Sequence, residues 1–432
     1  MSTGLGVSVR ELTTLPAVLR APHHPRAQIE ADALAGIQRM LTFARRQVPY
    51  YRDNADYARD ISELSELAGL PILDKPQVLG AGVERFHVVS SGAFHVDRSS
   101  GTTGRVIEVR HDDAAYGYHG ATVLRRFLVS GYRPWWPIVQ LKPFPRPVRW
   151  FQRLGLFPRT VVDSALPADE LARRVLASRP RVLMGYPVVL RALLRALGDS
   201  ELTELRRRLR LVLTDSELLS SEGRRLLEDG FGTLVLDEYS AYEVLTVSSQ
   251  CRSGSMHVDE DRVWLEIVDD DGEPVPDGVE GRVVVTHFRE RAMPLVRYAL
   301  GDRAVRRSDG CACGMTTATM ELSAGRSDDV VVLPDGQHVY TGTFLGLAMF
   351  TPGVAESMVH QYADGAISIA LVVDERSGLS FDEVAAEYSR RLDGHVGQHV
   401  DAVFGEAANV TITPGGKARF VTSEYRSGGR VA

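Results

Sequence analysis

Lysine is rare in this chain of 432 residues, and one lysine stands in a setting that suits chemistry. The lysines are Lys75, Lys142 and Lys417, and arginine supplies nearly all of the 50 basic residues. Lys417 follows two glycines in the stretch TPGGKARF near the C-terminus. Its ammonium group is a point charge on a flexible stem, and the two glycines before it favour a bend in the chain. An exposed loop lysine is the alternative.

Glycines and hydroxyl groups are concentrated in the stretch DRSSGTTGR at 97–105. Glycine lets successive backbone N–H groups converge on an anion, and serine and threonine add hydroxyl donors. Strand-like FHV precedes the stretch and VIEVR follows it, but the G-x-x-x-x-G-K-[ST] pattern of a Walker loop does not occur. We expect a phosphate-binding loop here, with a flexible hairpin connection as the alternative.

The cysteines and one histidine form a candidate metal-binding set. Cys251 and His257 lie in CRSGSMH, and Cys311 and Cys313 lie in GCACG. Three thiolates and one imidazole are a standard tetrahedral zinc set, and four protein ligands leave no open position. We therefore expect a structural Zn²⁺ ion that ties together the two ends of the intervening segment. Free buried cysteines beside a surface histidine are the alternative.

The secondary structure that must position these residues is clearest in the middle of the chain, where short apolar runs alternate with helical patterns. RVLMGYP precedes VVLRALLRAL, LRLVLTDSE precedes SSEGRRLLEDGF, and TLVLDEYSAYE follows. Continuous apolar runs alternating with amphipathic helical patterns predict a parallel sheet covered on both faces. Upstream, AQIEADALAGIQRMLTFARRQVPYYRD has the apolar spacing of a helix.

The pattern changes in the second half of the chain. RVWLEIVDDDGEPVPDGVEGRVVVTHF predicts two strands about a turn, and hence an antiparallel region. After the short polar linker GRSDD, the segments AISIALVVDE, SFDEVAAEYSRRLDGHVG and NVTIT predict a strand, a helix and a strand. We expect an α/β fold in which a large N-terminal domain, 1–326, combines parallel α/β sheet with an antiparallel β region. A small mobile α+β domain, 327–432, follows it.

Composition excludes several classes of protein. Hydrophobic residues make up 44% and charged residues 25%, as in ordinary globular proteins, and a net charge of −6 argues against a general nucleic-acid binder. No run of 18 apolar residues predicts a membrane span, and the N-terminus has no signal-peptide pattern. We expect a cytoplasmic monomer or homodimer without nucleic-acid or membrane partners, in which the cysteines do not form disulfides.

Five stretches in a fixed order carry a family resemblance. SSGTTGR (99–105), DEYSAYE (237–243), VRYALGDRA (296–304), GRSDD (325–329) and GGKAR (415–419) resemble the signature motifs of adenylate-forming enzymes. That superfamily contains acyl-CoA synthetases, peptide-synthetase adenylation domains and luciferases. RRQVPYYRD and LPILDKPQV resemble the branch of phenylacetate–CoA ligases and their capsule-biosynthesis-type relatives, some of which carry a similar Cys/His pattern. The resemblance covers nearly the whole chain.

The resemblance implies an ATP- and Mg²⁺-dependent ligase. Such an enzyme activates a carboxylic acid as an acyl-adenylate, releases pyrophosphate, and transfers the acyl group to an acceptor, either CoA or an amine. Lys417 would stabilise charge on the α-phosphate and the carboxylate, Glu243 would hold Mg²⁺, and Thr103 would bind the β- and γ-phosphates. The small domain would rotate between the two steps about a hinge at Asp328.

The resemblance also implies the nucleotide site. Tyr239 would stack on adenine, Asp302 would accept hydrogen bonds from the ribose hydroxyls, and Arg326 would touch the ribose. The full set of nucleotide-binding residues that it implies is Ser99, Ser100, Gly101, Thr102, Thr103, Gly104, Ser216, Glu217, Tyr239, Ser240, Tyr242, Asp302, Arg326 and Lys417. Tyr186 is a candidate for the acyl pocket, with ordinary core as the alternative, and family analogy favours an aryl or arylacetic acid.

Two departures from the family pattern leave alternatives open. The usual YG-x-[ST]-E appears as Tyr239-Ser240-Ala241-Tyr242-Glu243, and the stretch after the hinge, VVVLPDGQHVYTGTF, lacks the asparagine pattern of thioester-forming relatives. An amine therefore competes with CoA as the acceptor. A catalytically impaired nucleotide-binding homologue, acting as a regulator or partner protein, is the alternative from a different class.

Overall fold

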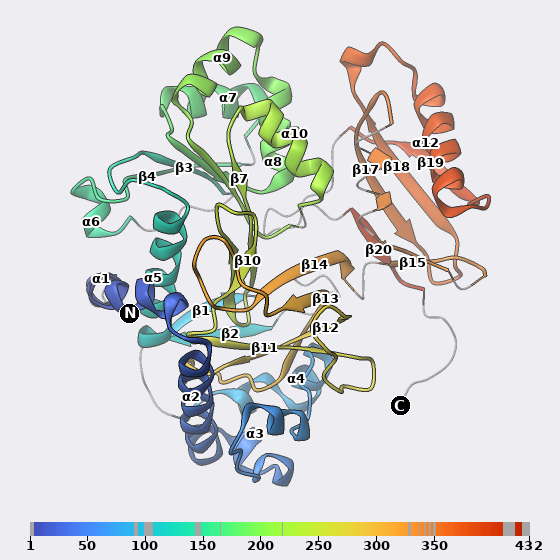
Figure 1. The fold of residues 1–432 in the computed structure, drawn as a ribbon. Coiled ribbons are helices and arrows are strands. Elements are labelled where there is room, and N and C mark those ends of the chain that lie inside the picture. Colours follow the sequence, from blue (N-terminus) through green and yellow to red (C-terminus); the bar gives the residue numbers. More distant parts are fainter. Residues whose placement is uncertain are drawn as a thin grey trace.

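The part of the chain that the structure, a computed structural model, describes is a mixed α/β fold with three larger sheets (Figure 1). The residues described are 4–89, 94–98, 107–142, 148–164, 166–217, 219–326, 330–335, 337–340, 343–344, 347–348, 351–408 and 420–425. Within these ranges, no helix has the length and apolar character needed to cross a membrane.

A parallel sheet forms the first layer, as the alternating pattern predicts. Its strands lie in the order β4-β3-β5-β6-β7, and every neighbouring pair is parallel. Their bounds are β3 Ile138–Leu141, β4 Arg159–Val162, β5 Val182–Gly185, β6 Leu211–Thr214 and β7 Val235–Leu236.

Both faces of this sheet are covered, because alternate residues along each buried strand point to opposite sides. Val139, Leu183 and Val212 pack under one set of helices, and Ile138 and Val182 pack under the other. The first set is α7 Ala168–Ala177, α8 Pro187–Ala196, α9 Asp199–Arg208 and α10 Ser221–Phe231, and the second is α5 Asp113–Val129 and α6 Trp150–Arg153. The N-terminal helix α1, Gly4–Arg20, lies beside α5 (Figure 1).

A seven-stranded sheet, mainly antiparallel, forms the second layer, in the order β11-β12-β13-β14-β10-β9-β8. The predicted hairpin is confirmed, because β11 and β12 pair antiparallel from Val263 opposite His287 to Val268 opposite Arg282. The strand bounds are β8 Glu238–Ala241, β9 Leu245–Gln250, β10 Met256–Val258, β11 Val263–Val268, β12 Glu280–His287, β13 Tyr298–Arg307 and β14 Thr319–Arg326.

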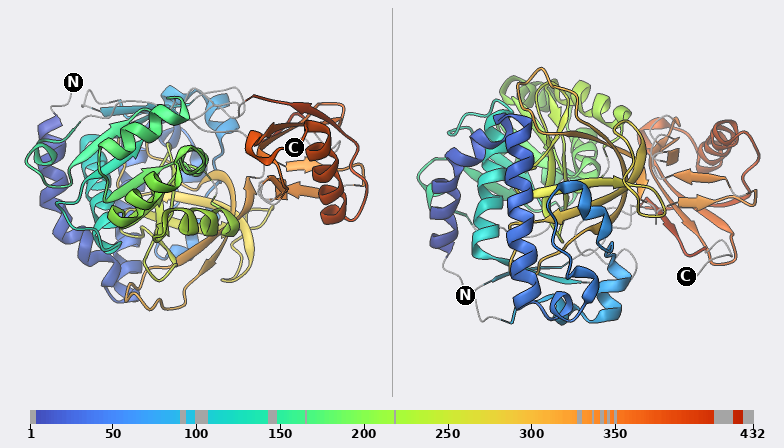
Figure 2. Two further views of the ribbon diagram at one scale, coloured as in Figure 1. Left: turned by 90° about the horizontal axis from the view of Figure 1, so that it is seen from above. Right: turned by 60° about the horizontal axis from the view of Figure 1, so that its bottom comes forward.

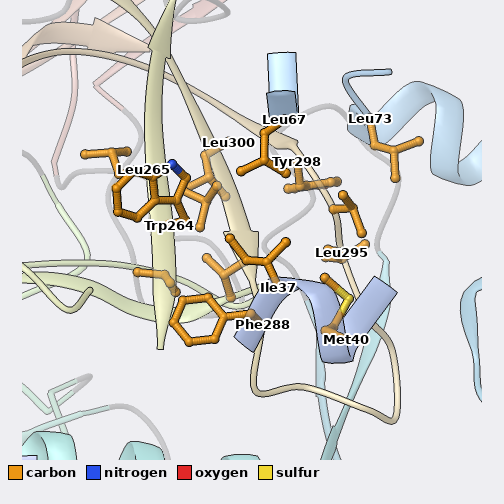
Figure 3. Close-up of a cluster of buried hydrophobic side chains, with 14 of the residues drawn as sticks. Ile37, Met40, Leu67, Leu73, Trp264, Leu265, Phe288, Leu295, Tyr298 and Leu300 are labelled. Carbon is orange, nitrogen blue, oxygen red and sulfur yellow. The ribbon is translucent and has the colours of Figure 1, made fainter. Parts of the chain in front are cut away.

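The largest hydrophobic cluster lies between this sheet and the N-terminal helices. The predicted helix is α2, Arg26–Gln47, and its Ile37 and Met40 face Trp264, Leu265 and Phe288 in the cluster (Figure 3). The apolar spacing thus predicts the buried stripe correctly. The shorter helices α3, Pro49–Arg52, and α4, Lys75–Ala81, follow α2, and β1, Phe94–Arg98, pairs with β2, Glu108–Asp112.

The C-terminal part has a separate hydrophobic core. The predicted strand and helix are β18 and α12, and α12 begins at a Ser380–Glu383 capping box and ends at Gly397 in the left-handed region. NVTIT lies outside the described residues. The element bounds are β15 Val330–Val332, β16 His338–Tyr340, β17 Val354–Gln361, β18 Ile367–Val373, α12 Phe381–Val396, β19 Ala402–Glu406 and β20 Val421–Ser423.

This C-terminal part contacts the parallel-sheet layer through α8 (Figures 1 and 2). Glu356 on β17 accepts hydrogen bonds from Arg191, at 3.0 Å, and from Arg195, at 3.1 Å. Phe420 packs into the hydrophobic cluster under α8, and the Arg191 guanidinium lies 5.9 Å from the centre of its ring. The two parts are therefore joined by buried apolar and ionic contacts.

Candidate active site

The carboxyl edge of the parallel sheet carries the central cavity. Lys142, Tyr186 and Asp215 directly follow β3, β5 and β6, which are adjacent strands. The strand order reverses at β3, since β4 lies on one side of it and β5 on the other. Such a switch point opens a crevice beyond the strand ends. A cavity of about 250 Å³ lies there, and it is lined by Lys142, Tyr186, Asp215, Ser216 and Tyr242.

Backbone geometry holds two of the predicted nucleotide residues at this edge. Ser216 has a φ of 67°, which is unusual for a residue other than glycine and turns the chain sharply after β6. The Glu217 carboxylate accepts a hydrogen bond from the backbone N–H of Val188, at 3.2 Å, in the first turn of α8. A carboxylate is favoured at this position by the helix dipole.

The two residues predicted to bind adenine and ribose are in direct contact. Tyr239 on β8 donates a hydrogen bond to Asp302 on β13, with 2.6 Å between the oxygen atoms. Asp302 in turn lies opposite Arg326 in the register of β13 and β14. Residues from three separate motifs therefore lie close together in the fold, although β14, β10 and β9 separate β13 from β8 in the order of the sheet.

The turn that carries Glu243 is supported by a buried histidine that sequence reasoning missed. His111 donates from Nε2 to the backbone carbonyl of Tyr242, at 3.0 Å, and from Nδ1 to the Glu290 carboxylate, at 2.9 Å. Because both partners are acceptors, the ring carries both protons. Burial lowers the pKa of His111, but Glu290 raises it more, so the pKa lies above its ordinary value. No local signal predicts this pair, since 179 positions separate its members.

A buried ion pair lies beside Tyr186. Lys142 donates to the Asp215 carboxylate, and its Nζ lies 3.8 Å from the centre of the Tyr186 ring. Burial raises the pKa of Asp215, but Lys142 lowers it more, so the carboxyl stays ionised. Tyr186 lines the cavity, as predicted for an acyl-pocket residue, while Lys142 and Asp215 were not predicted as site residues.

The four predicted zinc ligands converge. The candidate donor atoms of Cys251, His257, Cys311 and Cys313 all lie within 4.8 Å of one another. The Cys251 and Cys311 sulfur atoms are 3.7 Å apart, close to the roughly 3.8 Å edge of a tetrahedron with Zn–S bonds of about 2.3 Å. His257 Nδ1 lies 3.1 Å from the Thr317 hydroxyl, which leaves Nε2 facing Cys313, at 3.2 Å. The donor set fits a structural zinc ion.

Several predicted residues lie outside the described residues, so the structure says nothing of them. They are Ser99, Ser100, Gly101, Thr102, Thr103, Gly104, Asp328 and Lys417. The strands on either side of the serine/threonine loop pair antiparallel from Phe94 opposite Asp112 to Arg98 opposite Glu108. The loop is therefore the connection of a hairpin, a geometry that suits either interpretation of it.

Curated proteins similar to this chain are phenylacetate–coenzyme A ligases. The ligase of Thermus thermophilus is 26% identical over 394 residues, which cover 87% of this chain and 85% of that protein. The ligase of Escherichia coli is 26% identical over 315 residues, which cover 68% of this chain and 70% of that protein. No family model matches the chain.

Solved structures with the same fold contain acyl-adenylates. A 2-hydroxyisobutyryl-CoA ligase in the postadenylation state gives a TM-score of 0.76 at 18% identity, over 94% of this chain and 91% of that chain. The same enzyme in the thioesterification state gives a TM-score of 0.61, over 94% of this chain and 92% of that chain. An anthranilate CoA ligase with anthranoyl-AMP gives 0.56 at 19% identity, over 75% of this chain and 65% of that chain.

Proposed function

We propose that this chain, a relative of the phenylacetate–CoA ligases with the fold of the adenylate-forming enzymes, is an AMP-forming acid ligase. It activates a carboxylic acid as an acyl-adenylate and passes the acyl group to CoA. One observation carries the proposal: Ser216, Ser240 and Tyr242, from two distant segments, line a cavity at the switch point of the parallel sheet. Tyr239, next to Ser240 in the chain, contacts Asp302 from a third segment. The order of the motifs along the sequence does not by itself require these residues to lie close together.

The chemistry follows from the residue types. A carboxylate is a poor electrophile, so it attacks the α-phosphate of ATP and displaces pyrophosphate. The protein contributes mainly position and neutralisation of charge. Tyr239 and Asp302 would hold the adenosine, and the hairpin loop with Thr102 and Thr103 would hold the outer phosphates. Glu243 would hold Mg²⁺, for which carboxylate oxygen is a suitable ligand. His111 would keep the turn before Glu243 in place through the carbonyl of Tyr242.

CoA is the better supported acceptor. The relatives similar over most of this chain are named as CoA ligases, and the solved structures that share its fold include CoA ligases. The departures after the hinge keep an amine as the competitor. Purified protein, ATP, Mg²⁺ and a panel of carboxylic acids should give acid-dependent exchange of pyrophosphate into ATP. With an acid that supports exchange, adding CoA should release AMP and a thioester, and adding amines alone should not.

Each outcome of this experiment has a separate meaning. Exchange without any acid dependence, or no exchange with any acid, would contradict the ligase and favour a nucleotide-binding regulator. Exchange followed by amide formation, with no thioester, would keep the acyl-adenylate step and replace CoA by an amine.

We also infer a structural zinc ion at Cys251, His257, Cys311 and Cys313, supported by the spacing of their donor atoms. Metal analysis should find about one zinc per chain, and less than about 0.2 would contradict the site. Replacing His257 with glutamine should lower Tm by about 5 °C or more, since each kcal/mol shifts Tm by about 2–4 °C in domains of 150–250 residues. His360→Gln, in the C-terminal part, is the matched control and should keep the zinc. Equal melting of both variants, with zinc retained in both, would show that His257 is not one of the ligands.

A further inference from the structure

The cavity beside the nucleotide residues is where the acyl group must lie if the proposed function holds. Ser216, Ser240 and Tyr242 form part of its lining, so one end adjoins the predicted nucleotide site. Most of the rest of the lining comes from the parallel-sheet layer and the helices α1, α5 and α6, and strands β1, β8 and β9 add a few residues. An acid with its carboxylate toward the α-phosphate would therefore extend its acyl part among these side chains.

Part of this lining is apolar and would pack against a ring or an aliphatic chain. It includes Val123, Leu124, Phe127, Phe151, Phe157 and Met184. Such side chains supply most of the affinity for a small ligand, and a few polar groups supply orientation and selectivity.

The same cavity contains two ion pairs that are unusually buried. Lys142 is 5% exposed and Asp215 is 3% exposed, and their side chains are paired. Glu11 is 3% exposed, and its carboxylate lies 2.7 Å from the Arg149 guanidinium. Gln140 adds a buried amide, which accepts a hydrogen bond from Arg159 at 3.4 Å.

The position of Glu11 is built into the helix packing. Glu11 is on α1, and the facing residue on α5 is Gly120, where a Cβ atom would collide with the Glu11 carboxylate. Gly117, three positions earlier on the same face of α5, makes the same room for the side chain of Arg10. The two glycines allow α1 to approach α5 closely and place a carboxylate in the cavity lining.

A purely apolar acyl group would fit this lining poorly. An apolar acyl group would displace water from the ion pairs and the amide. It could not replace the hydrogen bonds of that water, and leaving polar atoms without partners costs free energy. Each pair is neutral as a whole, and the other charged residues of the lining, Asp97, Arg159 and Glu238, include both signs. The lining therefore favours a neutral group that both donates and accepts hydrogen bonds over a further full charge.

We propose that the acid carries a neutral hydrogen-bonding substituent, such as a hydroxyl or an amino group on a ring, and that Lys142, Asp215, Glu11 and Arg149 select for it. This inference rests on the proposed function and specifies its substrate class. Lys142 and Glu11 are specificity-determining residues, since the predicted nucleotide-binding residues are separate from them.

The first experiment measures acid-dependent pyrophosphate exchange with matched acids. The probes are phenylacetate and benzoate, their hydroxyl- and amino-substituted forms, and the corresponding dicarboxylic acids. We expect kcat/KM for at least one neutral substituted acid to exceed that of its parent by about 100-fold, because a site built to hydrogen-bond a group rejects the analogue without it. If the kcat/KM of a parent acid or a dicarboxylic acid equals or exceeds that of every substituted acid, this inference is wrong, but the proposed function still holds. If no acid in the panel supports exchange, the proposed function is wrong as well.

The second experiment uses variants of the same protein. Lys142→Met combined with Asp215→Asn should reduce the preference for the substituted acid over its parent by about 100-fold, the discrimination that hydrogen bonding supplied. Gly120→Ala, which displaces the Glu11 carboxylate, should reduce the same ratio. It is the substitute test if the double variant does not fold. Lys75→Met is the matched control, since Lys75 lies on α4 and outside the cavity lining, and it should keep the ratio. An unchanged ratio in the folded cavity variants would overturn the assignment.

Discussion

Replacing Lys417 with alanine is expected to reduce acid-dependent pyrophosphate exchange by at least about 100-fold, which is the effect of removing one preorganised donor to a developing charge. Lys417 is the residue that the family pattern places on the α-phosphate and the reacting carboxylate, and the chain has few other lysines. Phe420, which follows it closely, packs under α8 in the parallel-sheet layer. The chain at Phe420, three positions after Lys417, therefore contacts the layer that bears the cavity.

Two controls make this result specific. Lys75→Ala changes a lysine outside the cavity lining and should keep normal exchange. Supplied with a synthetic acyl-adenylate and CoA, the Lys417→Ala protein should still form the thioester, because Lys417 serves only the first step. Near-normal exchange by a folded Lys417→Ala protein would refute the assignment, and loss of both steps would point to a damaged fold.

Replacing Glu356 with alanine should slow the first half-reaction and spare the second. Glu356 is 4% exposed and is the shared acceptor for Arg191 and Arg195, so it holds β17 of the C-terminal part against α8. Without it, the packing of the C-terminal part against α8, which we expect the first half-reaction to need, loses a buried ionic contact. A shift of about 1.4 kcal/mol in the balance between arrangements would lower the rate of exchange about tenfold.

The measurement compares exchange with thioester formation from a synthetic acyl-adenylate, in the same preparation. Glu387→Ala is the matched control, because Glu387 pairs with Arg390 and Arg391 within α12 and has no hydrogen bond or ion pair with α8 among the described residues. The expected result is a selective loss of exchange in Glu356→Ala. Equal loss in both steps, or in both variants, would show that Glu356 only stabilises the fold.

Local patterns in the sequence predict much of this protein because the forces behind them are local. The apolar stripe of α2, the hairpin of β11 and β12, and the helix α12 depend on neighbours within a few positions, and all three predictions are confirmed. The motifs that name Tyr239 and Asp302 are also short stretches. Each is recognisable by itself, although their contact at 2.6 Å depends on the fold, since three strands lie between β8 and β13 in the sheet order.

Buried polar pairs could not be predicted in the same way. Lys142 and Asp215 are 73 positions apart, and they meet because β3, β5 and β6 end at the same edge of the parallel sheet. Glu11 reaches the cavity only because glycines on α5 admit α1. None of these three residues has a sequence context that marks it as a buried charged residue.

The sequence by itself therefore determined several helices and strands, the family motifs, and the cysteines and histidine of the predicted zinc site. The tertiary structure decided which charges share the acyl cavity, how the turn before Glu243 is supported, and where the C-terminal part is fastened. The physical reason is the range of the forces. Periodicity and capping act within a few residues of the chain, whereas the pairing of a buried charge depends on whichever distant strand or helix the fold brings within about 3 Å.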